Sequence, residues 1–149
     1  LHAIVDAHKN GFDENIYLDP QTRTKIEETG GANFIFIDKE GTLVIPKSDS
    51  ILPSVTRRSI AVVAKDILGM KVEERPVKLA ELSDFAECGV CGTAAVVCPV
   101  GKVVDHGREI CFPSGMESMG PVIQKLYDTL TGIQMGKIEG PAGWVHKIM

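Results

Sequence analysis

The sequence contains 149 residues, of which 44% are hydrophobic and 24% are charged. This length fits one compact domain with its own core, and the composition excludes a disordered chain. Sixteen basic and twenty acidic residues give a net charge of −4, which argues against nucleic-acid or membrane-surface binding driven by charge. The longest apolar runs, Ile60–Ala64 and Ala94–Val100, are too short to span a bilayer.

The first residue and the cysteine content bear on processing and compartment. The chain opens on Leu1 with no basic segment and no apolar run behind it, which predicts no secretory signal. An opening on leucine also suggests a piece of a longer protein. Four cysteines are too few for a disulfide scaffold, so we expect reduced thiols in a cytoplasmic protein.

The spacing of apolar residues, glycines and prolines predicts alternating helices and strands, and therefore a mixed α/β domain. In the first half, we expect a helix over His2–Lys9, strands over Asn15–Asp19 and Lys25–Glu28, and a hairpin of Asn33–Ile37 with Thr42–Ile45. In the second half, we expect a helix from Ser54 or Val55 to Leu68, an edge strand Val72–Val77 containing Pro76, a short helix Leu79–Ala86, two strands within Gly89–Val104 and a final helix over Gly120–Met135.

Two turns of small residues are candidate anion sites. Ile51-Leu52-Pro53-Ser54-Val55-Thr56 leads into a helix whose first N–H groups lack intrahelical partners and attract negative charge. Gly92-Thr93-Ala94-Ala95 offers bare backbone and one hydroxyl group to a phosphate. By spacing alone, a simple helix cap and a simple bend are the favoured interpretations, because neither turn matches a P-loop.

The cysteines and carboxylates allow further interpretations. Cys88-x-x-Cys91, followed by Cys98 and Cys111, lacks a second pair at metal-ligand spacing, so structural buried thiols are favoured over a metal or redox site. Glu27 and Glu28 are adjacent on a strand, so at most one of them faces inward, and the residues alone do not decide whether either does. The Arg57-Arg58 pair is typical of a solvated helix face.

Four motifs then occur in a recognisable order. They are Tyr17-Leu18-Asp19, Ile26-Glu27-Glu28-Thr29-Gly30-Gly31-Ala32-Asn33-Phe34, Ser50-Ile51-Leu52-Pro53-Ser54-Val55-Thr56-Arg57 and Gly92-Thr93-Ala94-Ala95. Together with Gln124–Tyr127, Gly132–Gly136 and Gly143-Trp144, they resemble the branched-chain amino acid aminotransferases over essentially the whole chain. Any one of these motifs alone would be a weak signal.

The resemblance implies a fold-type IV enzyme that uses pyridoxal 5'-phosphate. Residues 1–149 resemble its C-terminal domain, a pseudo-barrel sheet flanked by helices. Glu28 matches the glutamate that bonds the pyridine nitrogen and sustains the electron sink. The resemblance also implies that Val55, Thr56 and Thr93 hold the cofactor phosphate and that Leu52 packs against the ring.

The resemblance further implies a substrate-binding region at Gly31, Ala94 and Ala95, where the last two offer N–H groups to the substrate carboxylate. The parent enzyme would be a homodimer that transfers the amino group of leucine, isoleucine or valine to 2-oxoglutarate. The Schiff-base lysine of the family would lie upstream of Leu1, so this chain has no catalytic lysine of its own and is expected to be inactive alone. No metal site is expected.

Two alternatives stay open. Another fold-type IV enzyme, such as a D-amino acid aminotransferase or an aminodeoxychorismate lyase, would share most of these motifs. A non-catalytic metal or redox module would instead use Cys88, Cys91 and Cys98.

Overall fold

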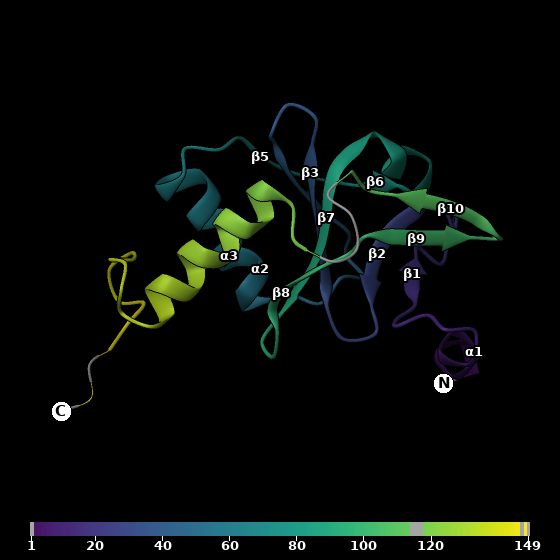
Figure 1. Ribbon diagram of the computed structural model, residues 1–149, viewed down its shortest axis with the longest axis horizontal. Coiled ribbons are helices and arrows are strands. Elements are labelled where there is room, and N and C mark those ends of the chain that lie inside the picture. Colours follow the sequence, from purple (N-terminus) through teal and green to yellow (C-terminus); the bar gives the residue numbers. More distant parts are fainter. Residues whose placement is uncertain (1, 114–117, 147, 149) are drawn as a thin grey trace.

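The computed structural model describes residues 2–113, 118–146 and 148, and it shows a largely antiparallel sheet with helices packed beside it (Figure 1). The helical segments are α1 (His2–Lys9), α2 (Val55–Val62), the π-helix η1 (Val63–Ile67), the 3-10 helix η2 (Leu79–Asp84) and α3 (Pro121–Gln134). The strands are β1 (Ile16–Leu18), β2 (Lys25–Thr29), β3 (Asn33–Asp38), β4 (Leu43–Pro46), β5 (Val72–Arg75), β6 (Val77–Lys78), β7 (Phe85–Gly92), β8 (Val96–Pro99), β9 (Lys102–Asp105) and β10 (Arg108–Cys111).

Strand β3 lies at the centre of the sheet. Its whole length pairs with β7 on one side, whereas β2 and β4 share its other side, one at each end. Because β2 turns away to pair with β1 and β6, the sheet divides at this point. The Ser48 hydroxyl donates to Glu27 Oε1 at 3.0 Å and links the two branches. Among the described residues, only β4 and β5 pair in parallel, and β9–β10 forms a separate hairpin.

Each face of the sheet has its own apolar core. The first cluster contains Ile35, Ile37 and Cys91 and is covered by α2 and α3. The second contains Phe34, Phe36 and Cys88 and is covered by η2 and the β9–β10 hairpin. Alternate residues of β3 and β7 therefore enter different clusters, as the two-residue period of a strand requires. Nearly every residue of β3 is buried, which is typical of a strand covered on both faces.

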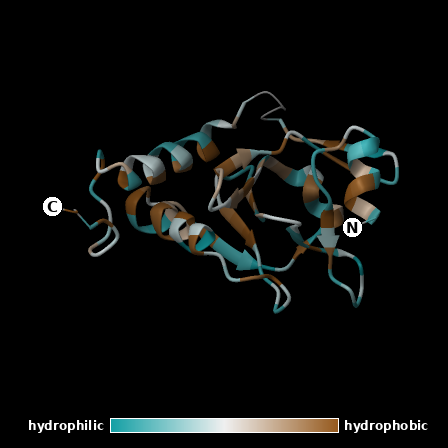
Figure 2. Cartoon of the chain, turned by 90° about the horizontal axis from the view of Figure 1, so that it is seen from below, coloured by the Kyte–Doolittle hydropathy of each residue, from teal (hydrophilic) through white to brown (hydrophobic). Residues whose placement is uncertain are grey.

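The helices bury the stripes that their apolar spacing predicts. Ile60, Val63 and Ala64 of α2–η1 are fully buried, and Ile123, Leu126, Leu130 and Ile133 of α3 form the matching stripe. Figure 2 shows apolar and polar residues alternating around these helices, as expected for helices with one face on a core. No helix in the described part of the chain has the length and apolar character to cross a membrane.

The predicted mixed α/β class is confirmed, and most predicted elements occur within one or two residues of their expected bounds. The predicted helix to Leu68 is helical as far as Ile67, with a π-helical segment from Val63. Three other predictions were wrong in detail. The predicted helix Leu79–Ala86 is a 3-10 helix that ends at Asp84, after which Phe85 begins β7. The stretch Gly89–Val104 was predicted to contain two strands, but it contains parts of three, β7, β8 and β9, and β10 was not predicted. Pro76 divides the predicted edge strand in two, because proline cannot donate a ladder hydrogen bond.

Candidate functional site

Glu28 lies on β2 at the entrance to a tight turn. Its Cα partner across the sheet is Asn33, whose Nδ2 donates to Glu28 Oε2 at 3.3 Å. The Thr29 side chain shapes the turn, because its Oγ1 accepts from Ala32 N at 3.0 Å while Thr29 N donates to Ala32 O at 2.9 Å. Glu28 is half-buried and its neighbour Glu27 is buried against Ser48. Glu28 therefore keeps acceptor capacity for a further donor.

A second turn lies beside the first. Asn33 pairs with Cys91, so Gly92 follows at the same end of the sheet. A Cβ on Gly92 would stand 3.5 Å from Gly31 O, which shows how closely the backbones of the two turns approach. Thr93, Ala94 and Ala95 form the exposed loop between β7 and β8.

The residue that follows this loop, at the start of β8, is held in a strained conformation. Val96 has a φ of 59°, although a β-branched residue disfavours the left-handed region. Three-residue hairpin loops close on such a left-handed position, where glycine is the usual residue. The left-handed residue therefore belongs to the geometry of this turn, and strained backbone of this kind is also frequent at functional sites.

The first turn of α2 presents N–H groups to solvent. Ser54 is the N-cap, and its Oγ accepts a hydrogen bond at 3.2 Å from the N–H group of Arg57, the third helical residue. Val55 and Thr56 precede that residue, and their N–H groups have no intrahelical acceptor. Leu52 and Val55 are 73% and 70% exposed, which is unusual for apolar side chains of this size and leaves them free to contact a bound group.

Arg57 connects α2 to the sheet, and the interpretation as a solvated-face residue was wrong for it. Arg57 Nη1 donates to Pro46 O at 3.2 Å, while its buried Nε finds no hydrogen-bond partner among the described residues. Its positive charge acts on the Cys91 thiol. The spacing could have revealed this, because Arg57 falls on the same helical stripe as the buried Ile60 and Ala64.

The fold thus gathers most of the predicted site residues at one end of the sheet. Glu28, Gly31 and the Thr93–Ala95 loop lie on neighbouring strands, and α2 packs against β7. One carboxylate, a group of free N–H donors and exposed apolar side chains suit a ligand with a basic ring nitrogen and a phosphate. These residues therefore fit pyridoxal phosphate. Asn33, the partner of Glu28, was not singled out by the sequence patterns.

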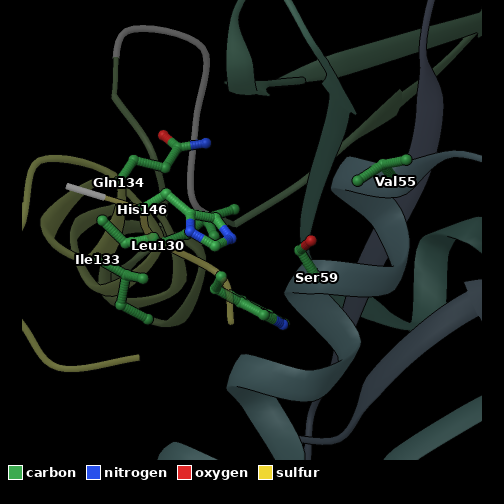
Figure 3. A pocket seen from close by; sticks show the side chains of 8 residues that line it. Val55, Ser59, Leu130, Ile133, Gln134 and His146 are labelled. Atoms are coloured by element: carbon green, nitrogen blue, oxygen red, sulfur yellow. The ribbon is translucent and has the colours of Figure 1, made fainter. Parts of the chain in front are cut away.

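A cavity of about 460 Å³ adjoins α2 on another side. Val55 and Ser59 of α2 line one side of it, and Leu130, Ile133 and Gln134 of α3 and His146 of the C-terminal segment line the other (Figure 3). The cavity includes Val55 but neither Glu28 nor Thr93. It is therefore distinct from the surface on which the two turns meet.

The cysteines are not arranged as a redox or metal centre. Cys88 and Cys91 are buried on opposite faces of β7, because their sequence separation is odd. Burial raises the pKa of Cys88 well above its ordinary value, and it raises the pKa of Cys91 to about 12 against the opposing charge of Arg57. Cys98 and Cys111 are exposed, so the expectation of buried thiols holds for two of the four. In the described ranges, no three His, Cys, Asp or Glu side chains could share a metal ion.

Comparison with known proteins gives a consistent result. The branched-chain-amino-acid aminotransferase of Haemophilus influenzae is 51% identical over 137 residues, which cover 92% of this chain and 40% of that protein. The crystal structure of the Escherichia coli branched-chain aminotransferase matches with a TM-score of 0.80 and 32% identity over 94% of this chain and 44% of that one. The enzyme of Thermobaculum terrenum in its PLP form matches with a TM-score of 0.77 and 31% identity over 90% of this chain and 41% of that one.

The chain spans about two fifths of the length of the curated relatives it matches. The family model for amino-transferase class IV matches residues 2–103, which is more than half of the chain. This match covers Glu28, the first turn of α2 and the Thr93–Ala95 loop. The chain therefore belongs to the class IV aminotransferases.

Proposed function

We propose that residues 1–149 form the C-terminal, cofactor-binding domain of a pyridoxal-phosphate-dependent aminotransferase for leucine, isoleucine and valine, with 2-oxoglutarate as the amino acceptor. The observation that carries the proposal is the meeting of Glu28 with two backbone turns, one of them ending at the strained Val96. The names of the relatives at 40–51% identity support the branched-chain substrates. The family resemblance supports a homodimer.

The residues of this chain would bind and orient the cofactor. Glu28 would accept a hydrogen bond from the pyridine nitrogen and keep it protonated. The N–H groups of Val55 and Thr56 and the hydroxyl of Thr93 would hold the phosphate at the positive end of α2. Leu52 would cover the ring. When bound, pyridoxal phosphate supplies the electron sink for amino-group transfer.

The loop that follows β7 would position the substrate. The N–H groups of Ala94 and Ala95 would bind the α-carboxylate, and the open space over Gly31, where a Cβ would meet nothing within 4 Å, leaves room for the substrate. No lysine here matches the cofactor lysine of the family. We therefore propose that the chain works as part of a longer protein that supplies this amine and its proton transfer.

The test uses a protein extended upstream to the length of its relatives. It should be yellow and should transaminate L-leucine, and Glu28→Ala should lower turnover by on the order of 10²–10³-fold without loss of fold, as removal of a preorganised charge partner does. Glu74→Ala, which changes an exposed carboxylate on β5, should retain full turnover. A colourless product, activity on D-alanine in place of L-leucine, or an unchanged Glu28→Ala enzyme would each contradict the proposal.

A further inference from the structure

A second pocket lies away from the candidate cofactor site. Its volume is about 390 Å³, within the range of small-molecule sites, and its lining comes from three loops: Arg23 and Thr24 after β1, Lys78, Leu79 and Ala80 around the start of η2, and Asp105, Arg108 and Ile110 of the β9–β10 hairpin. Leu79 and Ile110 belong to the second apolar cluster, whereas Cys91, beside the candidate site, belongs to the first. The pocket therefore lies on the opposite face of the sheet.

The charge of this pocket is opposite to that of the chain. Arg23, Lys78 and Arg108 face one carboxylate, Asp105, in a protein with a net charge of −4. None of these three cations belongs to an ion pair with another described residue. Asp105 Oδ1 lies 2.7 Å from His106 Nδ1, so its charge is directed to a neighbour outside the pocket lining. An anion entering the pocket would displace no existing salt bridge of the three cations.

The loops around the pocket are held in place by their own hydrogen bonds. Asp19 accepts from Thr22 N at 2.6 Å, Thr24 N at 3.0 Å and Lys25 N at 2.8 Å. This network holds the intervening Arg23 at a φ of 56°, a left-handed conformation that an arginine does not favour. Leu79 N donates to Thr24 O at 2.7 Å and joins the second loop to the first.

The third loop is also in a left-handed conformation. His106 and Gly107 have φ values of 48° and 81°, the geometry of a tight two-residue hairpin turn. This turn joins Asp105 to Arg108 and brings both to the pocket rim. The backbone positions of Arg23 and Arg108 are thus set before any ligand arrives, so binding has to order only their exposed side chains.

We propose that this pocket binds a small molecule that carries a phosphate or carboxylate group on an apolar body. The two guanidinium groups and Lys78 match such an oxyanion, because arginine donates in a planar fork that fits carboxylate and phosphate oxygens. Leu79 and Ile110 supply the apolar floor for the rest of the ligand. The proposal is independent of the function proposed above, since no pocket residue belongs to the candidate cofactor site.

The test is a titration of the ¹⁵N-labelled 149-residue chain with phenyl phosphate and with inorganic phosphate, followed by amide chemical shifts. The amides of Thr24, Ala80 and Arg108 should shift and saturate, and phenyl phosphate should bind more tightly because it also contacts the apolar floor. The Arg23→Gln/Arg108→Gln variant should bind at least tenfold more weakly. Lys78→Gln should weaken binding severalfold. Because the backbone at this position is unstrained, this variant still tests the pocket if the double variant fails to fold.

The control is Lys125→Gln/Lys137→Gln, which removes the same charge from surface positions outside the pocket. It should bind like the unmodified chain. Both variants make the chain more negative by two charges. Equal weakening in the control would therefore mean that the anion responds only to the overall charge of the chain, and it would overturn the proposal. Shifts that never saturate would overturn it as well. Shifts confined to Thr56 and Thr93 would support the cofactor site alone and reject this pocket, so the two proposals fail separately.

Discussion

Glu87 shows how one buried carboxylate holds a helix to the sheet. It lies on β7, is 4% exposed, and accepts from Val122 N at 3.1 Å and Ile123 N at 2.9 Å at the start of α3. Pro121, the first helical residue, has no N–H to satisfy. The two free donors of the first turn therefore both bind Glu87, and its charge faces the positive end of the helix.

We expect Glu87→Gln to lower the free energy of unfolding by about 2–4 kcal/mol. A hydrogen bond to a charged group contributes about 1.5–3 kcal/mol, and glutamine can keep only one of the two while turning its own NH₂ toward the other buried donor. Urea unfolding followed by circular dichroism measures the loss. Glu109→Gln, which breaks only an exposed ion pair with Lys102, should cost less than about 1 kcal/mol.

A double-mutant cycle isolates the contact. A Cβ on Gly120 would overlap the Glu87 carboxyl group, so Gly120→Ala should destabilise the chain. In a Glu87→Ala background the same substitution should cost at least about 1 kcal/mol less, because the overlapping atoms are gone. Additive effects of the two substitutions, or a Glu87→Gln chain as stable as the unmodified one, would refute the assigned role.

Three further predictions concern single groups. Hydrogen bonds from Thr22 and from the surrounding backbone lower the pKa of Asp19 below that of an unfolded carboxyl group, so its stabilisation is complete above about pH 4 and is lost as the pH falls further. Urea titrations should therefore show the stability difference between the unmodified chain and Asp19→Asn shrinking below pH 4; a constant difference would contradict this. Iodoacetamide at pH 8 should alkylate the exposed Cys98 and leave Cys91, with its pKa raised to about 12, unmodified in the native chain, as mass spectrometry can check. Ser54→Ala should lower the free energy of unfolding by about 1 kcal/mol through loss of the α2 cap, and a chain of unchanged stability would exclude that cap.

The sequence predicted those helices and turns that are determined by residues close together in the chain. The stripe Ile123, Leu126, Leu130 and Ile133 follows from helical spacing, and the β3–β4 hairpin follows from its turn residues. Leu79–Ala86 failed because a short run of apolar residues fits a helical turn and a strand equally well. Phe85 is in a strand and not in a helix because β7 pairs with β3, and that pairing joins residues about fifty positions apart.

In the candidate site too, features set by neighbouring residues could be predicted, whereas features set by strand pairing could not. The small-residue turns could be recognised from sequence, but the contact between Gly31 and Gly92 depends on strand register. Asn33 and Arg57 were missed because their roles depend on neighbours from other elements. Glu87 was also missed, although a helix that starts Gly120-Pro121 without an adjacent Ser, Thr, Asp or Asn must find its cap elsewhere.

The alternation of β3 and β7 between two apolar clusters has a consequence for unfolding. Neither cluster can open without disturbing strands whose other face supports the second cluster. A shift of one residue in either strand would exchange the contents of both clusters at once, so no partly slipped state retains either. The two halves of the interior should therefore be lost in a single cooperative step, and the β3 amide hydrogens should exchange with solvent only through global unfolding.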